Sequence, residues 1–324
     1  MNHRVQKMNV DRYNRPVINL RIAITQQCNL ECFYCHREGQ FLSSTDMKPE
    51  EMATIASIST EFGVRKLKIT GGEPLLRSDL DEIILRLDQI PRIEEISIVT
   101  NGRLLTPEKA SELRKNGLAR VNISLPSTRE EVYKRVTGAS LGTATNGIES
   151  AIQAGLNPVK INTVVMRGIN DSEIDQLIGY AESLGAILQL IELEPVNSDG
   201  YSYANYHFPL NDIEEKIAAK AKRVETRRYM QARRVYTLEN AKVEIVRPIE
   251  NTAFCMNCTR LRLTSDGMLK PCLMRNDNLV DILTPLRRHS GHNELHAIFS
   301  KAIELREPYW KPPCVISQRF PSAI

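Results

Sequence analysis

The sequence predicts an α/β fold, in which an open, partial (βα)6 TIM-like barrel is followed by a smaller α+β domain. Between residues 19 and 192, short apolar runs alternate with longer segments that carry apolar residues at helical spacing. Such alternation indicates a parallel sheet with helices packed outside it. Six strands are too few to close an eight-stranded barrel, so we expect the barrel to be incomplete.

The six βα units follow one another in order along the chain. Strands are expected at residues 19–25, 66–70, 95–100, 120–125, 159–166 and 187–192. Helices are expected at residues 48–62, 79–89, 107–116, 143–154 and 171–184. The first helix carries Met52, Ile55, Ile58 and Phe62 on one face, which is typical of an amphipathic helix. Because parallel strands end at the same edge, we expect residues that follow the strands to face one mouth.

The pattern changes after about residue 205. A helix is expected at residues 210–221, and residues 223–238 and 242–247 are interpreted as paired strands. The densest basic stretch, residues 220–234, is interpreted as a solvent-exposed part of this strand pair. We therefore divide the chain into a barrel, residues 1–207, and a C-terminal domain, residues 208–324.

The composition is that of an ordinary globular protein. The chain has 324 residues, of which 42% are hydrophobic and 25% are charged. No apolar run approaches the roughly 18 residues that a membrane span needs, and the polar first 17 residues do not resemble a signal peptide. We therefore expect a cytoplasmic protein without a membrane partner. A net charge of only +4 does not indicate nucleic-acid binding, but it suits a small polyanionic substrate.

Three cysteines lie within eight residues, directly after the first expected strand: Cys28, Cys32 and Cys35. Thiolates are soft ligands that suit zinc, copper(I) and iron–sulfur clusters. Three of them can hold three irons of a [4Fe–4S] cube and leave the fourth iron open for chemistry. The C-x3-C-x2-C spacing, with an aromatic residue before the last cysteine, resembles the radical S-adenosylmethionine (SAM) enzymes.

Other interpretations of this loop stay open. Cys32 to His36 also spells the C-x-x-C-H pattern of c-type haem attachment, but this would leave Cys28 unexplained. A structural zinc on the three cysteines and His36 is chemically possible, although Cys35 and His36 are adjacent and project apart. Disulfides are disfavoured because no export signal is expected.

Gly71-Gly72-Glu73-Pro74 follows the second expected strand. Glycine lacks a Cβ, so this segment permits close approach of a ligand to the backbone. Gly-Gly alone would favour a tight strand-to-helix turn without further function. Its place one strand after the cysteine loop matches the GGEP motif of radical SAM enzymes, which contacts the methionine end of SAM.

A second cysteine trio consists of Cys255, Cys258 and Cys272, and a seventh cysteine, Cys314, stands alone. A zinc knuckle completed by Cys314 or by a histidine is one interpretation of the trio; the candidate histidines are His289, His292 and His296. Alternation along a strand would point Arg260 and Arg262 to the same side. Two guanidinium groups on one face can clamp a phosphate, which a purely structural zinc site does not need.

Both trios and the arginine pair together resemble the GTP 3′,8-cyclases, the MoaA family of molybdenum cofactor biosynthesis within the radical SAM superfamily. The resemblance covers residues 10–275, and the stretches CFYCHREG and LQLIELEPVN resemble the archaeal branch. It implies a radical SAM barrel that binds SAM and a first [4Fe–4S] cluster. It also implies a C-terminal region in which a second [4Fe–4S] cluster binds the guanine of GTP.

The resemblance assigns roles to individual residues. The first cluster would be held by Cys28, Cys32 and Cys35, and the second by Cys255, Cys258 and Cys272. SAM would lie near Tyr34, Gly72, Glu73 and Ser124. GTP, mainly its triphosphate, would be held by Arg21, Lys68, Lys160, Arg260 and Arg262. Lys68 and Lys160 lie in otherwise apolar strands, where an inward lysine needs an anion.

The implied reaction is that of a lyase without a side-chain acid or base. The reduced first cluster would cleave SAM to a 5′-deoxyadenosyl radical, which removes hydrogen from C3′ of GTP and leads to 3′,8-cyclo-7,8-dihydro-GTP. This is the first step of molybdopterin biosynthesis. The implied partners are an electron donor protein, the downstream cyclic pyranopterin phosphate synthase and a second copy of the chain.

Several positions depart from the family. Lys68 stands where bacterial members carry arginine, and Val99 stands where they carry threonine. Gln189 and Glu194 replace an arginine and a methionine. Ser124-Leu-Pro126 replaces Ser-Leu-Asp, and the chain ends at Ile324 without the family's Gly-Gly. Two other functions stay open: a peptide maturase with two clusters, and a non-catalytic iron–sulfur or zinc-binding protein. Neither the extra cysteines nor the peptide-binding extension of a maturase is visible.

Overall fold

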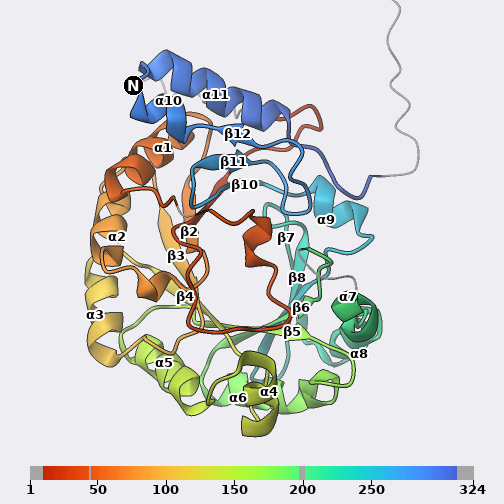
Figure 1. Cartoon of the computed structure of the whole chain (residues 1–324). Coiled ribbons are helices and arrows are strands. Elements are labelled where there is room, and N and C mark those ends of the chain that lie inside the picture. Colours follow the sequence, from red (N-terminus) through yellow and green to blue (C-terminus); the bar gives the residue numbers. More distant parts are fainter. Residues whose placement is uncertain (1–9, 44, 197–200, 312–324) are drawn as a thin grey trace, which may run out of the picture.

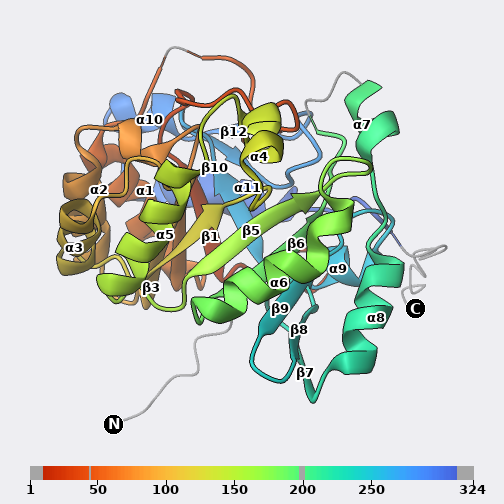
Figure 2. The ribbon, with the colours of Figure 1, turned by 90° about the horizontal axis from the view of Figure 1, so that it is seen from below.

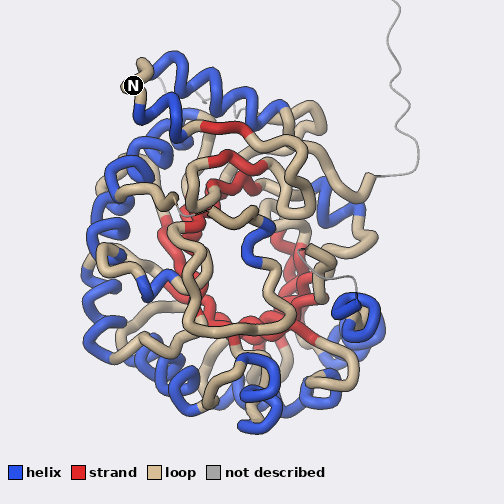
Figure 3. The backbone as a smooth tube through the Cα atoms, in the orientation of Figure 1, coloured by secondary structure: helices blue, strands red, loops and turns tan. Residues whose placement is uncertain are grey.

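The computed structural model describes residues 10–43, 45–196 and 201–311, and in these ranges all twelve strands form one sheet. The six predicted barrel strands are neighbours in chain order, and all of them are parallel. They are β1 (Asn19–Ala23), β2 (Lys66–Thr70), β3 (Glu95–Thr100), β4 (Arg120–Ser124), β5 (Lys160–Val165) and β6 (Ile187–Glu192). The sheet curves into a ring with helices outside it (Figures 1 and 3), which confirms the predicted TIM-like barrel.

The predicted barrel helices form with small shifts at their ends. They are α1 (Pro49–Glu61), α2 (Leu80–Asp88), α3 (Pro107–Lys115), α5 (Gly142–Gln153) and α6 (Ile174–Ser183). Proline in the first turn starts both α1 and α3, where its fixed φ suits a helix and its missing N–H is not needed. The short 3-10 segments η1 (Arg37–Gly39), η2 (Pro74–Leu76) and η3 (Asp171–Glu173) lie in the loops. The sequence did not predict α4 (Glu130–Thr137), which ends at a left-handed Gly138.

The C-terminal segment extends the sheet at both of its ends. β9 (Lys242–Val246) pairs in parallel with β6, and β10 (Arg260–Leu263) pairs in parallel with β1. β11 (Met268–Lys270) and β12 (Val280–Asp281) continue beyond β10 in antiparallel pairing. The division of the chain at residue 207 therefore stays a prediction, because the segments on its two sides share one sheet.

One expected strand is wrong. Residues 223–238 do not form a single strand but an antiparallel hairpin of β7 (Arg223–Arg227) and β8 (Arg233–Thr237). The turn between them closes with a 2.9 Å hydrogen bond from the Met230 amide to the Arg227 carbonyl, and Gln231 adopts a positive φ of 65°. The run of charged residues gave no apolar pattern from which this turn could be located.

The remaining helices lie outside the sheet (Figure 2). α8 (Asn211–Lys220) confirms its prediction, whereas α7 (Tyr201–Tyr206), α9 (Thr252–Met256), α10 (Leu283–Arg287) and α11 (His292–Glu304) were not predicted. α11 packs against α1, where Phe299 stacks on Phe62 with ring centroids 4.9 Å apart. No helix in the described ranges is long and apolar enough to cross a membrane.

Candidate active site

A cavity of about 240 Å³ opens at the carboxyl ends of the barrel strands. It brings together the predicted residues of the first site and the predicted substrate cations: Arg21, Cys28, Cys32, Tyr34, Cys35, Lys68, Gly72, Glu73, Ser124, Lys160, Arg260 and Arg262. These residues come from β1, β2, β4, β5 and β10 and from the loops that follow β1 and β2. The expectation that the strand ends share one mouth is confirmed.

The loop that carries the first cysteine trio follows β1 and lies across the interior of the strand ring (red in Figure 1). The Cys35 amide donates a 3.0 Å hydrogen bond to the Cys32 carbonyl, which folds the trio into a tight turn. All three thiols are free. Burial, together with repulsion from thiolates at Cys35 and Cys28, raises the pKa of Cys32 to about 12. The turn thus gathers thiols that would repel one another as bare thiolates.

The Gly71-Gly72-Glu73 segment fixes the start of this loop. The Gly72 amide donates to the Thr25 carbonyl at 2.8 Å, and the Glu73 amide donates to the Gln27 carbonyl at 2.7 Å. A Cβ added to Gly72 would lie 2.1 Å from the Gln27 carbonyl oxygen, so only glycine fits. The buried Glu73 carboxylate in turn accepts from the Thr100 hydroxyl at 2.6 Å and from the Asn101 amide at 2.7 Å. The glycines therefore hold the cysteine loop against β2.

A row of cations crosses the sheet beneath the cavity. In the strand register, Arg262, Arg21 and Lys68 are consecutive partners on β10, β1 and β2, and Arg120 follows on β4 after Ser97. Like charges directly opposite one another on neighbouring strands are destabilising. Burial, and then the charge of Arg120, lowers the pKa of Lys68 well below its usual value. The buried Nε of Arg21 has no hydrogen-bond partner in the described ranges. The row thus has spare capacity to bind an anion.

Glu38 is the carboxylate that holds one end of this row, and it was not predicted. It accepts from Arg21 at 2.7 Å, from Arg262 at 2.9 Å and from the Thr70 hydroxyl at 2.9 Å. Burial opposes its ionisation, but Arg21 and Arg262 outweigh burial and lower the pKa of Glu38 to about 2. Glu38 is therefore a fixed anion at the floor of the cavity.

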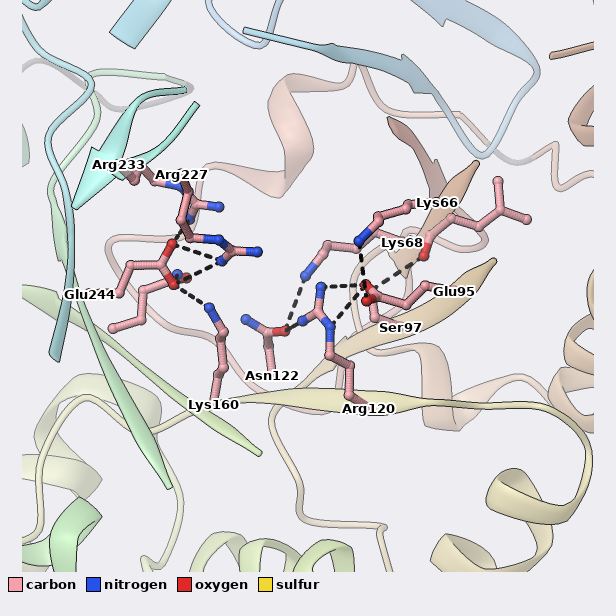
Figure 4. Close-up of polar contacts among 12 residues, drawn as sticks. Lys66, Lys68, Glu95, Ser97, Arg120, Asn122, Lys160, Arg227, Arg233 and Glu244 are labelled. Carbon is pink, nitrogen blue, oxygen red and sulfur yellow. Dashed lines mark hydrogen bonds and ion pairs between the residues drawn. The ribbon is translucent and has the colours of Figure 1, made fainter. Parts of the chain in front are cut away.

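A second carboxylate, Glu244 on β9, anchors the cations on the other side of the cavity. Lys160, Arg227 and Arg233 all form ion pairs with it, and Figure 4 shows the three side chains converging on its oxygens. The interpretation of residues 220–234 as solvent-exposed is therefore wrong in part, because Arg227, Met230 and Arg233 line the cavity and Gln231 is buried. The charge-rich sequence gave no sign of which arginines face inward.

The second cysteine trio lies around an adjoining cavity of about 60 Å³. Cys255, Cys258 and Cys272 line it, and Arg260 and Arg262 line both cavities, as the alternation along β10 predicted. Burial tends to raise the pKa of Cys258, but Arg306, Arg260 and Arg15 lower it overall. The two trios thus face two neighbouring cavities that share a pair of arginines.

Two buried arginines hold the loop of the second trio by its backbone. Arg15 donates to the Cys255 carbonyl at 2.8 Å, and Arg306 donates to the Cys258 carbonyl at 2.5 Å. Both arginines also pair with Asp11, at 2.8 Å and 3.3 Å. These three residues were not predicted, because the contact joins segments from opposite ends of the chain.

In the described ranges, no three His, Cys, Asp or Glu side chains converge closely enough to hold a single metal ion. Two of the three histidines considered for a zinc knuckle lie at the end of α1, since His292 contacts Glu61 at 2.8 Å and the rings of His296 and Phe62 have centroids 4.4 Å apart. A [4Fe–4S] cluster takes each thiolate on a different iron, so it suits thiols that stand further apart. Cys314 and the end of the chain lie outside the described residues.

Several of the positions that depart from the family line the cavity. Val99, Gln189 and Glu194 all line it. Gln189 donates to Glu244 at 2.9 Å, and Glu194 lies 3.9 Å from the His36 ring nitrogen. The Pro126 carbonyl accepts a 2.7 Å hydrogen bond from the Asn170 side chain. The side-chain amide of Gln189 is thus already hydrogen-bonded to a carboxylate of the chain itself.

Comparison with known proteins agrees with this arrangement. The protein family described as Radical SAM superfamily matches residues 22–181, and the family described as Molybdenum Cofactor Synthesis C matches residues 186–312. The chain is 46% identical to a probable GTP 3′,8-cyclase of Thermococcus kodakarensis, over 93% of this chain and 99% of that protein. It is 48% identical to a probable GTP 3′,8-cyclase of Pyrococcus abyssi, over 94% of this chain and 100% of that protein.

Solved structures share the fold at much lower identity. Streptococcus suis SuiB bound to S-adenosylmethionine superposes with a TM-score of 0.64 at 17% identity, over 84% of this chain. The match covers 65% of SuiB. This likeness supports the radical SAM barrel alone. The relatives named above are similar over nearly their whole length, and the chain therefore belongs to the GTP 3′,8-cyclase family of the radical SAM superfamily.

Proposed function

We propose that this chain is a radical SAM lyase that converts GTP to 3′,8-cyclo-7,8-dihydro-GTP, the first step of molybdopterin biosynthesis. The observation that carries the proposal is that one cavity is lined both by the first cysteine trio and by a row of buried cations. The trio suits an iron–sulfur cluster, and the cations suit a polyphosphate. The likeness to relatives named probable GTP 3′,8-cyclase supports the same reaction.

The first cofactor site would be built by the loop after β1. Cys28, Cys32 and Cys35 offer three free thiols to a [4Fe–4S] cluster. SAM would lie between the cluster and the strand ends, near Tyr34, Gly72, Glu73 and Ser124. When bound, the cluster and SAM supply the one-electron chemistry that removes a hydrogen atom from the ribose of the substrate. The contribution of the protein is to place the substrate and to exclude side reactions.

The second cysteine trio would hold a second [4Fe–4S] cluster next to the substrate. Cys255, Cys258 and Cys272 are free thiols around a small cavity that shares lining residues with the main one. Arg260 and Arg262 line both cavities and would bind phosphates beside this cluster. A structural metal site would not need two guanidinium groups at its edge.

The cations of the sheet would hold the triphosphate. Arg21 keeps an unpartnered buried Nε, and Lys68 donates only to the Asn122 side chain, at 3.1 Å, among the described residues. An anionic ligand would relieve the repulsion between these neighbouring cations. Holding the phosphates in this way fixes the ribose near the first cysteine trio, and such placement can account for much of a rate enhancement.

The reaction also implies partners. One-electron chemistry needs an electron donor protein, and the product must pass to the cyclic pyranopterin phosphate synthase of the same pathway. These partners, a homodimer and a cytoplasmic location stay predictions.

The proposal is tested with anaerobically reconstituted protein, a reductant, SAM and GTP. We expect cleavage of SAM together with consumption of GTP and formation of a cyclised nucleotide, detected by mass spectrometry. ATP serves as the matched nucleotide control and should not be converted. SAM cleavage that leaves GTP unchanged would contradict the proposed substrate, and the absence of any SAM cleavage would contradict the enzyme class.

A further inference from the structure

We propose that Arg227 and Arg233, anchored with Lys160 by Glu244, form a second phosphate-binding wall that positions the nucleotide in the active-site cavity. The proposal rests on the proposed function and extends it to the β7–β8 hairpin. It assigns Arg227 and Arg233 to the phosphates and Glu244 to the positioning of these arginines. Figure 4 shows this wall on one side of Lys160 and Asn122, with Lys68 and Arg120 on the other.

The wall is organised around the Glu244 carboxylate, whose side chain is fully buried. Arg227 Nη1 lies 3.1 Å from one oxygen of Glu244 and 3.4 Å from the other, and Arg233 Nη1 lies 3.3 Å from the first. Lys160 and the Gln189 amide both donate to the second oxygen. The carboxylate therefore fixes three cations that come from three different strands.

This arrangement leaves positive charge in excess. Within the described ranges, Glu244 is the only carboxylate that pairs with any of the three cations. One negative charge offsets one of three positive charges, and the side chains of Lys160 and Arg233 are only 5% exposed. Burying unpaired charge is costly, so the excess indicates that an anion completes the site.

The strand register gives a second reason to expect an anion at this site, because it places two arginines opposite one another. Arg227 and Arg233 are direct partners across the antiparallel β7–β8 pair. Like charges in this position repel one another. Arg227 keeps 31% of its side chain exposed and lines the cavity, so its guanidinium can be reached by a ligand. A phosphate group has enough oxygens to accept from both guanidinium groups at once.

The hairpin is also fixed to the loop of the second cysteine trio. The Thr259 hydroxyl donates to the Tyr229 carbonyl at 2.6 Å, and the Gln231 amide donates to the Asn257 carbonyl at 3.0 Å. Asn257 and Thr259 flank Cys258 in the sequence. The wall therefore has a defined position relative to that trio, as a site that holds one end of a nucleotide requires.

The last barrel strand, β6, adds no cation to this side of the cavity. Gln189 stands where an arginine was expected, and its amide donates to Glu244. A neutral amide occupied in this way contributes no charge to a phosphate site. Arg227 and Arg233 supply positive charge on the same side of the cavity from a different element.

The test compares Arg227→Gln and Arg233→Gln with Arg234→Gln in the full-length protein with its clusters. Arg234 is the matched control, because it is adjacent to Arg233 on β8 but its side chain is 59% exposed and faces Glu214. Equilibrium binding of GTP, GMP and guanosine is measured under anaerobic conditions, and circular dichroism checks the fold. An Arg233→Lys variant keeps a charge at the buried position in case Arg233→Gln does not fold.

We expect each neutral substitution in the wall to weaken GTP binding about 10-fold or more, since charge-assisted hydrogen bonds are lost. GMP should be affected less and guanosine not at all, and Arg233→Lys should recover part of the loss. Arg234→Gln should bind GTP like the unmodified protein. Unchanged GTP binding in both wall variants, or an equal loss for guanosine, would overturn this inference alone. Absence of GTP binding by the unmodified protein would overturn the proposed function as well.

Discussion

Arg306 donates a 2.5 Å hydrogen bond to the backbone carbonyl of Cys258, and its side chain is almost completely buried. The same guanidinium donates to the Arg15 carbonyl at 2.9 Å and lies 3.3 Å from Asp11. Segments from the beginning and the end of the described chain thus meet at the second cysteine loop. The loop is therefore held by contacts that form only when the whole chain has folded.

Arg306→Met should strongly impair the second cysteine site. The substitution removes the side-chain donor of the Cys258 carbonyl and one of the two donors of the Arg15 carbonyl, which still accepts from the Asp11 amide. Asp11 keeps its pair with Arg15, so the main cost is a buried carbonyl without a donor, about 1–3 kcal/mol. We expect a lower melting temperature and loss of iron from the second site only. Thermal unfolding and the iron content of anaerobically reconstituted protein measure both effects.

Arg12→Met is the matched control for this substitution. Arg12 also pairs with a carboxylate, Glu307 at 3.0 Å, but its side chain is 58% exposed. Exposed ion pairs contribute little, so stability should change by less than about 1 kcal/mol. If Arg306→Met keeps its full iron content and melting temperature, Arg306 does not support the second cysteine loop.

Cys32→Ser should abolish SAM cleavage and leave the C-terminal cysteine site intact. The unmodified protein should bind about eight irons per chain, because each trio suits one four-iron cluster, and the variant should bind about four. Iron analysis and an assay for 5′-deoxyadenosine measure the two effects. SAM cleavage that persists in Cys32→Ser would show that the first trio is not the SAM site, and a zinc-only metal analysis would contradict both cluster assignments.

The barrel was predictable because its signals are local, whereas the carboxylates of the site depend on distant contacts. Strands such as β2, β3 and β6 match their predictions residue for residue, since each is a short apolar run between turn residues. Glu38 collects cations from β1 and β10, which are about 240 residues apart in sequence and adjacent in the sheet. No local sequence pattern predicts such a long-range contact.

Glu244 could have been found from the sequence. It lies in the apolar strand Lys242–Val246, and the argument that an inward lysine in an apolar strand needs an anion applies equally to an inward glutamate that needs a cation. The placement of Arg227 and Arg233 could not have been found in this way. It depends on the turn between β7 and β8, for which the charged sequence gives no periodic signal.

Gly72→Ala should displace the first cysteine loop. The added Cβ would lie 2.1 Å from the Gln27 carbonyl oxygen, so the backbone before Cys28 has to move. Overpacking of this kind typically destabilises a protein by about 1–3 kcal/mol. We expect a lower melting temperature and weaker SAM binding, measured by thermal unfolding and by calorimetry.

Gly179→Ala is the matched control, because Gly179 lies in α6 and a Cβ there meets no atom within 4 Å. Alanine stabilises a helix interior by about 0.5–1 kcal/mol relative to glycine. This variant should therefore be at least as stable as the unmodified protein. If Gly72→Ala also melts and binds SAM like the unmodified protein, the tight packing against residue 27 has no consequence for the site.

GTP binding should weaken as the pH rises through about 8. Burial lowers the pKa of Lys160 to about 8, although Glu244 raises it. Lys160 is therefore charged below that pH and neutral above it, and only the charged form attracts the triphosphate. Because binding favours the charged form, we expect affinity to fall about 10-fold between pH 7 and pH 9.5. Lys160→Arg stays charged throughout and should remove this fall; the same pH profile in both proteins would contradict the role of Lys160.

Arg260→Ala should weaken GTP binding without loss of iron. In the described ranges no hydrogen bond or ion pair involves the Arg260 guanidinium, whereas its partner Arg262 is held by Glu38 at 2.9 Å. Arg260 lines both cavities and is therefore free to bind a phosphate. A charge-assisted hydrogen bond contributes roughly 1.5–3 kcal/mol, so affinity should fall by about one to two powers of ten.

Three controls separate this role of Arg260 from a structural one. Guanosine, which lacks phosphates, should bind the variant and the unmodified protein almost equally. SAM cleavage without GTP should persist, and the cluster spectrum should change little, because the side chain of Arg260 carries no metal ligand. Loss of iron from Arg260→Ala would assign the arginine to the support of the cysteine site. Unchanged GTP affinity would show that Arg260 does not bind the phosphates.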